Sequence, residues 1–226
     1  TEEDYKIAAN KFKTSVYHVH GVGANSNKYY PYSIEKILTL RKKLGYSKDQ
    51  FILLCTGELN KNKNQSTIIK AVAEVVNDIP NIKILLAGNG PMELKLKSLV
   101  NELKINHVVD FLGYRTDLEN YVNICDVVIS ASFREGLPLN IMEGMLCCKP
   151  IISSSNRGHR ELVKNEVNGY ILIPNDIIGF SEHIKKLYDN HNLIESLGAA
   201  SRDIVRKFTI DNVVNELEHI YICKTY

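Results

Sequence analysis

Six short apolar runs alternate with stretches of helical periodicity between residues 51 and 173, and this alternation constrains the fold more than any other feature. The first, second and fourth runs are nearly all apolar, as expected of strands that are covered on both faces. The predicted strands span residues 51–56, 82–87, 107–111, 126–130, 150–153 and 170–173. The predicted helices between them span residues 64–77, 91–103, 117–123 and 138–147. This order predicts an α/β fold with an open, doubly wound parallel sheet.

The two ends of the chain follow other patterns. Residues 1–33 contain a short apolar run at 16–20, followed by the glycine-punctuated stretch 21–25, and indicate a linking segment. Residues 210–226 predict an amphipathic helix, because apolar side chains recur there at spacings of three and four. The division that follows is a linking segment over 1–33, a Rossmann-like α/β domain over 34–209 and a terminal helix over 210–226. The chain begins at Thr1 without an initiator methionine, as expected of a piece of a longer protein.

Composition excludes several classes of protein. The chain has 226 residues and a net charge of +2, which argues against an extended nucleic-acid surface and leaves only a local basic patch open. No apolar run approaches the roughly 20 residues of a membrane span. Five cysteines without metal or disulfide spacing indicate buried, reduced thiols in a cytosolic protein. His18 and His20 have no evident third ligand, so no metal site is expected.

A predicted turn and helix between the fourth and fifth strands carry the chemistry. Glu135 lies in the turn, and Glu143 follows eight residues later in the helix. Pro138 fits the first helical position, where its missing N–H costs nothing. The unpaired N–H groups near Leu139 and Asn140 then face the mouth of the sheet and favour an anion such as a phosphate.

The two glutamates suggest what accompanies that anion. Carboxylates beside an anion site would repel the anion, but they suit neutral hydroxyl groups, from which each carboxylate accepts charge-strengthened hydrogen bonds. A phosphate at the helix start with glutamates on either side therefore indicates a nucleotide-sugar pocket. The alternative is that Glu143 is a solvated helix residue and Glu135 a turn residue, and the spacing alone leaves both interpretations equally open.

Residues 126–172 resemble the donor-binding half of family 4 glycosyltransferases, enzymes built from two Rossmann-like domains in the GT-B fold. The family's Glu-x7-Glu motif is matched by Glu135 and Glu143. The surrounding segments 134–138, 149–151, 156–162 and 168–170 match as well. The sequence of these segments is similar to that of bacterial capsule and exopolysaccharide transferases. The resemblance extends over most of the chain from about residue 16. It implies that residues 1–33 link to an N-terminal acceptor domain and that the terminal helix crosses back toward that domain.

The loop after the first strand, residues 56–64, lies where open α/β sheets bind ligands. Gly57 allows close backbone approach, and Lys63 can reach a diphosphate as a mobile charge. From the residues alone, ordinary loop lysines are the likelier interpretation; by resemblance, Lys63 matches the family's diphosphate-binding lysine. Glu58 stands where an arginine is common in the broad family, although capsule-type relatives often have glutamate there too.

Glu58 cannot supply the positive charge of the arginine that is common at its position in the family. Either Lys63 binds the diphosphate together with the helix start, or Arg134 or Arg160 supplies the second charge. His159, beside Arg160 in a short helix after the fifth strand, is not assigned as a base.

Two further loops complete the predicted pocket. Gly90 lies in a Gly–Pro turn, which is often only a turn; in the family its glycines let the backbone pass close to the nucleotide. By resemblance, the backbone of Tyr114 and Arg115 reads the base edge. Either side chain could stack on the base or lie on the surface.

The resemblance implies a retaining, metal-independent transfer of a sugar from a nucleotide diphosphate, with UDP expected, to a glycan or lipid-linked acceptor. The full-length enzyme would be cytoplasmic, at the inner face of the membrane, without a cofactor, and this half alone would be inactive. Glu135 is the expected catalytic residue, and Glu143 is expected to hold the ribose. The expected substrate contacts are Gly57, Glu58, Lys63, Gly90, Tyr114, Arg115, Gly136, Leu137, Pro138, Leu139, Asn140 and Glu143.

Two alternatives remain open at this point. A GT-B sugar-nucleotide epimerase would share the sheet and the sugar pocket, although the Glu-x7-Glu motif disfavours it. A non-catalytic nucleotide-sugar-binding subunit would act only with a partner chain. An upstream fused domain in the full-length protein would favour the transferase over the subunit.

Overall fold

The computed structural model describes residues 1–222. Its centre is a six-stranded sheet in the order β3-β2-β1-β4-β5-β6, and every neighbouring pair of strands is parallel. The strands are β1 (Phe51–Thr56), β2 (Ile82–Ala87), β3 (Val109–Gly113), β4 (Val127–Ser130), β5 (Ile151–Ser154) and β6 (Gly169–Leu172). Each lies within two residues of a predicted run. The prediction of an open, doubly wound parallel sheet is confirmed.

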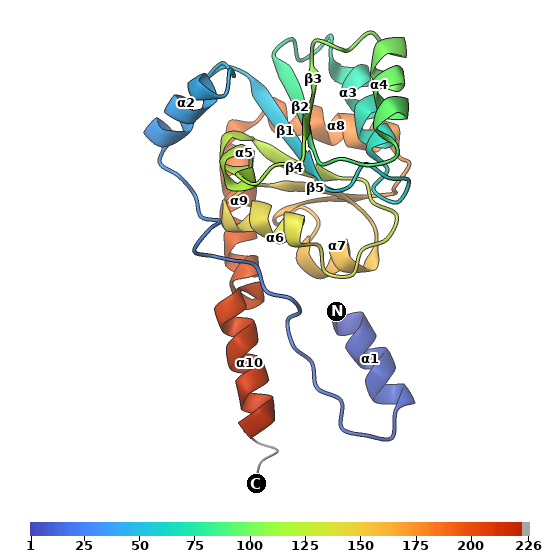
Figure 1. Cartoon of the computed structure of the whole chain (residues 1–226), viewed down its shortest axis with the longest axis vertical. Helices are drawn as coiled ribbons and strands as arrows, with labels where there is room; N and C mark the ends of the chain where they lie inside the picture. Colours follow the sequence, from blue (N-terminus) through green and yellow to red (C-terminus); the bar gives the residue numbers. More distant parts are fainter. Residues whose placement is uncertain (223–226) are drawn as a thin grey trace.

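Helices cover both faces of the sheet (Figure 1). The first face packs against α3 (Gln65–Val75), α4 (Glu93–Glu102) and α8 (Ile177–Tyr188). The second face packs against α2 (Ile34–Lys43), α5 (Leu118–Ile124), α6 (Leu139–Leu146) and α7 (Arg157–Leu162). Side chains of α9 (His191–Val205) belong to both cores, since Leu197 lies in the first and Val205 in the second.

The central strand β1 shows why its run is apolar throughout. Phe51, Leu53 and Cys55 are buried in the core of the first face, whereas Ile52 and Leu54 are buried in the core of the second. Because successive strand side chains point to opposite faces, a strand covered on both sides needs apolar residues at every position. The same strand places the binding edge, because the chain order reverses between β1 and β4. Open α/β sheets bind ligands beyond the carboxyl ends of the strands at such a switch point.

Residues 1–33 contain a helix that the sequence analysis did not predict, α1 (Glu2–Lys11). Its local signal is a capping box. The Thr1 side chain accepts a hydrogen bond from the backbone N–H of Asp4, and the Asp4 side chain accepts one from the backbone of Thr1. The acidic first turn of α1 contacts basic residues of α7: Asp4 lies 2.5 Å from Arg157, and Glu3 lies 3.2 Å from Arg160.

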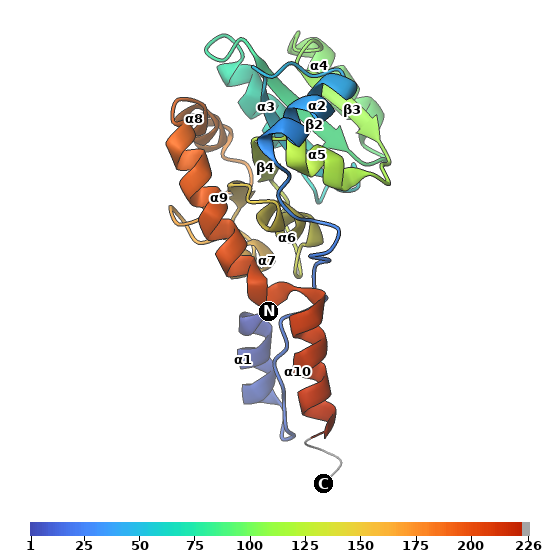
Figure 2. The same ribbon diagram turned by 90° about the vertical axis from the view of Figure 1, so that its left-hand side faces the viewer.

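The remaining part of the linking segment runs beside α10 (Ile210–Ile222), as Figure 2 shows. Ala24 donates to Phe208 O at 2.8 Å and accepts from Ile210 N at 3.0 Å, which ties the segment to the start of α10. Further along, the backbone and ring of His20 bond the carboxylate of Glu216. The amphipathic helix predicted over 210–226 is present as far as the structure describes it, and its last four positions lie outside the described residues.

Candidate functional site

A cavity of about 470 Å³ opens at the switch point, beyond the carboxyl ends of β1 and β2 and beside the start of α6. We call it the helix-start cavity. Its lining includes seven of the predicted substrate contacts: Gly57, Glu58, Tyr114, Arg115, Leu139, Asn140 and Glu143. Residues from four separated segments of the chain therefore meet at one place, as expected of a ligand site on this fold.

The floor of this cavity is bare backbone. Gly57 and Gly88 adopt φ angles of +136° and +140°, which side-chain-bearing residues rarely adopt. A Cβ atom on Gly88 would lie 2.1 Å from Gly57 O, so these two strand ends pack too closely for any side chain there. The predicted contact Gly90 is not among the residues that line this cavity, and a Cβ atom there would lie 2.4 Å from Leu59 O. Gly88 and Asn89 line the cavity instead.

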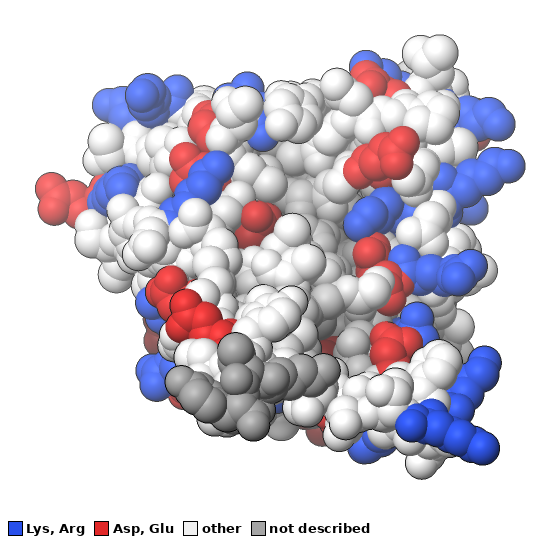
Figure 3. Space-filling model, turned by 60° about the horizontal axis from the view of Figure 1, so that its bottom comes forward, with Lys and Arg blue, Asp and Glu red and all other residues white. Residues whose placement is uncertain are grey.

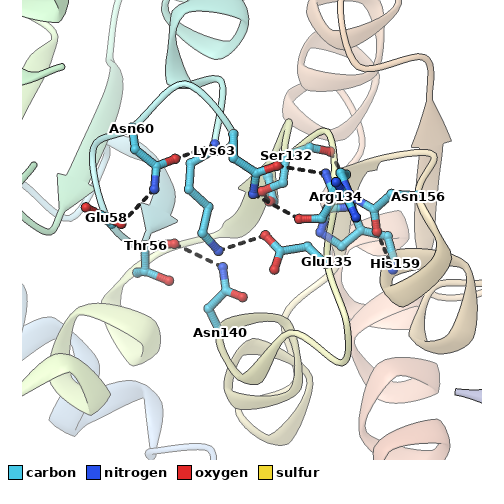
Figure 4. A network of polar contacts seen from close by, with 12 residues as sticks. Thr56, Glu58, Asn60, Lys63, Ser132, Arg134, Glu135, Asn140, Asn156 and His159 are labelled. Carbon is cyan, nitrogen blue, oxygen red and sulfur yellow. Dashed lines mark hydrogen bonds and ion pairs between the residues drawn. The ribbon is translucent and has the colours of Figure 1, made fainter. Parts of the chain in front are cut away.

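The start of α6 forms one wall. The helix begins at Leu139, and Pro138 is its N-cap residue in an extended conformation (φ −76°, ψ 110°), one position before the predicted place. The Asn140 side chain donates to Thr56 O at 3.0 Å and so fixes the helix start against the end of β1 (Figure 4). The backbone N–H groups of this first turn have no partner within the helix and suit an anion.

A second, smaller cavity of about 250 Å³ lies beside the first and contains Glu135. We call it the Glu135 cavity. The other residues that line it are Glu3, Phe133, Arg134, Asn156 and Arg157. The loop that carries Glu135 is fastened to the loop after β1, since Asn62 donates to Arg134 O at 2.9 Å and accepts from Arg134 N at 3.1 Å.

Lys63 links the two cavities. Its side chain lies against Gly57, which lines the helix-start cavity, and its ammonium group lies 2.7 Å from Glu135 Oε1 (Figure 4). Both side chains are mostly withdrawn from solvent, with 20% of Lys63 and 14% of Glu135 exposed. The sequence placed Lys63 and Glu135 in one pocket but gave no sign that they pair.

The two arginines considered as a second cation have different surroundings. Arg160 is directed to Ser155 and to Glu3 of α1, away from the helix-start cavity. Arg134 lines the Glu135 cavity. Glu58 lines the helix-start cavity and accepts from the Asn60 side chain at 2.7 Å. Of Lys63, Arg134 and Arg160, Lys63 is the one whose side chain lies against Gly57 at the end of β1.

At the other side of the helix-start cavity, the side chains of Tyr114 and Arg115 differ in their contacts and exposure. Arg115 makes two hydrogen bonds of 2.9 Å to Asp117 and lies 4.9 Å from the centre of the Tyr121 ring. The Tyr114 ring is 75% exposed at the rim. Of the two side chains, Tyr114 is therefore the more exposed at the rim of the cavity.

Gly136, Leu137 and Pro138 line neither cavity. Gly136 instead lies against α7, because a Cβ atom on Gly158 would come within 2.0 Å of its carbonyl oxygen. Leu137 lies against the linking segment at Gly21. The Gly136 carbonyl thus packs on α7 and the Leu137 side chain on the linking segment.

Glu143 is a half-buried carboxyl group that lines the helix-start cavity. Burial raises its pKa to about 7, although a hydrogen bond from the Tyr29 hydroxyl and the charge of Lys28 counteract part of this rise. Both partners belong to residues 1–33, so the linking segment reaches the pocket. The sequence analysis missed Tyr29, and an aromatic residue in a glycine-punctuated segment gave no local signal for this contact.

His159 supports the site without lining it. Its side chain is fully buried, and Nδ1 lies 2.7 Å from Ser154 O. Burial lowers its pKa to about 4, which leaves the ring neutral near pH 7.

Within residues 1–222, no three His, Cys, Asp or Glu side chains gather as metal ligands would. The helices of the same residues include none long and apolar enough to cross a membrane. On the face that Figure 3 shows, acidic and basic side chains are interspersed.

The fold and the switch-point cavities define one half of a GT-B glycosyltransferase. Residues 36–204 match the profile of the family "Glycosyl transferases group 1", and the chain belongs to this family. The family and the GT-B fold inferred from the sequence are thereby confirmed.

Three similar proteins illustrate the relationship. The chain is 36% identical over 203 residues to "Putative glycosyltransferase EpsD" of Bacillus subtilis, a match that covers 90% of this chain and 53% of that protein. It is 30% identical over 210 residues to the Escherichia coli "UDP-Gal:alpha-D-GlcNAc-diphosphoundecaprenol alpha-1,3-galactosyltransferase", covering 88% and 52%. The crystal structure of Anabaena Alr3699/HepE in complex with UDP and glucose superposes with a TM-score of 0.80 at 25% identity, covering 90% and 55%. The chain spans about half the length of these relatives.

Proposed function

We propose that this chain is the donor-binding half of a retaining glycosyltransferase, which transfers a sugar from a UDP sugar to a capsular or exopolysaccharide acceptor, either a glycan or a lipid-linked one. The observation that carries the proposal is the pair of adjacent cavities at the switch point, each with one glutamate of the motif and with Lys63 between them. The UDP and glucose bound to the Anabaena protein support this choice of donor. The E. coli relative, named for a diphosphoundecaprenol acceptor, supports a lipid-linked one.

The nucleotide occupies the helix-start cavity in this proposal. The volume of this cavity, about 470 Å³, lies within the usual range for small-molecule sites. The ribose hydroxyls donate to Glu143, and the base stacks on Tyr114 at the rim. The diphosphate meets the N–H groups at the start of α6, over the bare backbone of Gly57.

The sugar extends from the diphosphate toward Glu135. Lys63 then stands between the diphosphate and this carboxylate and shares its positive charge between them. When the bond from the anomeric carbon to the diphosphate breaks, negative charge develops on the leaving oxygen. The helix start and Lys63 are already oriented there to stabilise that charge, a task that requires no metal ion in this proposal. Glu135 positions the sugar and its reacting carbon.

The acceptor is held by the other half of the enzyme. Transfer requires acceptor and donor in near-attack geometry, and a single Rossmann-like half offers one wall of the cleft. We therefore expect this chain alone to bind the donor but to transfer no sugar. Transfer to an acceptor by the isolated chain, at a rate similar to that of the full-length protein, would contradict this division.

Calorimetric titration of the chain with UDP and GDP in the presence of excess chelator tests the proposal. We expect saturable binding of UDP, with weaker binding of GDP. Binding of neither nucleotide, or binding only after a divalent ion is added, would overturn it.

A further inference from the structure

The Glu135 cavity is lined by two arginines that the proposed function does not use. Arg134 precedes Glu135 in the chain, and Arg157 is the first residue of α7. Arg157 is close to Glu135, because a Cβ atom on the next residue, Gly158, would lie 3.0 Å from the Cβ atom of Glu135. The charge of Glu135 is balanced by Lys63, at 2.7 Å. The two arginines therefore make the contribution of the α/β domain to this cavity positive.

The acidic first turn of α1 supplies negative charge opposite these arginines. Asp4 Oδ1 lies 2.5 Å from Arg157 Nη1. Glu3 lines the cavity, and its carboxylate lies 3.2 Å from Arg160 of the same helix α7. One arginine of the cavity thus already binds a carboxylate, and this carboxylate comes from outside the α/β domain.

The contact between α1 and α7 is weak. None of the ten residues of α1 (Glu2–Lys11) is buried, and the side chains of Asp4 and Arg157 are 48% and 42% exposed. Exposed ion pairs contribute little stability, and salt weakens them further. An anionic group that enters the cavity can therefore replace Asp4 on Arg157.

We propose that the Glu135 cavity recognises a carboxylate on the donor sugar, that the donor is accordingly the UDP derivative of a hexuronic acid, and that Arg157 determines this specificity. The inference rests on the proposed function, in which the donor sugar extends toward Glu135. A guanidinium group matches the geometry of a carboxylate and can bind both of its oxygen atoms. Before the donor binds, Asp4 occupies Arg157, so α1 competes with the sugar for this site.

Calorimetric titration of the whole chain with four nucleotide sugars tests the inference. UDP-glucuronic acid and UDP-galacturonic acid carry the carboxylate, and UDP-glucose and UDP-galactose are their neutral counterparts. The ratio of the two affinities within each pair measures the preference for the carboxylate. UDP is titrated alongside, because it contains no donor sugar.

Four variants separate Arg157 from its surroundings. Arg157→Gln removes the guanidinium group from the cavity. Arg160→Gln is its matched control, because Arg160 belongs to the same helix and also pairs with α1 but is not among the residues that line the cavity. Asp4→Asn removes the competing carboxylate from Arg157. Glu2→Gln is the matched control for Asp4→Asn, because Glu2 lies in the same turn of α1 and its carboxylate pairs with Lys6.

The wild type should bind the acid of at least one pair on the order of ten-fold more tightly than its neutral counterpart, the usual effect of a hydrogen bond to a charged group. Arg157→Gln should abolish this preference and leave the affinities for UDP and the neutral sugars unchanged. Asp4→Asn should raise the affinity for the same acid several-fold. The two sides of one ion pair thus shift the affinity in opposite directions, whereas loss of a purely structural ion pair would shift it in the same direction from either side. Arg160→Gln and Glu2→Gln should keep the wild-type preference.

The outcomes separate this inference from the proposed function. If the wild type binds neither UDP nor any of the four sugars, the proposed function is overturned, and the inference with it. If UDP and the neutral sugars bind but neither acid is preferred, in the wild type or in Asp4→Asn, the inference alone is overturned. Equal losses of acid binding in Arg157→Gln and Arg160→Gln would also overturn it, because they would indicate an effect of overall charge or of α1 docking.

Discussion

Glu135 and Glu143 lie eight residues apart in the chain, yet the structure surrounds them differently. Glu135 stands in a turn and pairs with a cation of its own domain, Lys63, at 2.7 Å. Glu143 stands in a helix, where burial raises its pKa to about 7 and the Tyr29 hydroxyl, from the segment that precedes the domain, counteracts part of that rise. A carboxylate that shares a lysine suits a place beside a diphosphate. A carboxylate beside a neutral hydroxyl keeps its charge and has acceptor positions left for sugar hydroxyls, which suits a ribose.

Of the substitutions considered, removal of the Lys63 side chain should have the largest effect on UDP binding. Lys63→Ala takes the positive charge from the diphosphate and leaves Glu135 unpaired beside it. We expect UDP binding to weaken roughly 100-fold, at the upper end for a lost charged hydrogen bond. Calorimetry measures the loss. Lys61→Ala is the matched control, because Lys61 is an exposed lysine of the same loop outside both cavities, and it should leave the affinity unchanged. Equal effects of the two substitutions would refute the assignment of Lys63.

The burial of Glu143 should appear in folding stability as well. Its pKa is raised from 4.5 in the unfolded chain to about 7, so the folded form binds the proton more tightly. The contribution of this group is therefore fully present below about pH 4.5 and is lost as the pH rises through about 7. As the pH rises from 4 to 8, the free energy of unfolding of Glu143→Gln should increase relative to that of the wild type on the order of 1–3 kcal/mol. Urea unfolding at both pH values measures this change, and a pH-independent difference would argue against a buried, titrating Glu143.

The smallest effect concerns the rim of the helix-start cavity. Tyr114→Ala should weaken UDP binding several-fold, since it removes one stacking surface, whereas Tyr114→Phe should bind as the wild type does. Competition between UDP and ribose 5-phosphate sharpens this test, because the substitution should leave the base-free ligand unaffected. A similar loss for both ligands would show that Tyr114 does not contact the base.

The sequence sufficed for what is encoded locally. All six strands could be placed because each is a short apolar run between turn signals, and β1 must be apolar on both sides to serve two cores. The motif placed Glu143 beside Asn140 and Leu139 because they share one helix. The helix α1 also had a local signal, the Thr1–Asp4 capping box, which was overlooked.

The contacts that distinguish the two glutamates could not be predicted in this way. Lys63 and Glu135 are 72 residues apart, and Tyr29 is farther still from Glu143. No periodicity connects such positions, because their meeting depends on the strand order and on the path of the linking segment across the sheet. The close packing of Gly90 against Leu59 has the same origin, since it is a tertiary contact.

Paired titrations of Glu135→Ala and Glu143→Ala with UDP and with a UDP sugar test the division between the two cavities most directly. Glu143→Ala should weaken binding of both ligands by at least about ten-fold, as expected for a lost charge-assisted hydrogen bond. Glu135→Ala should leave UDP binding intact and reduce only the additional affinity for the sugar, together with turnover in the full-length enzyme. Equal weakening of UDP by both substitutions would contradict the account.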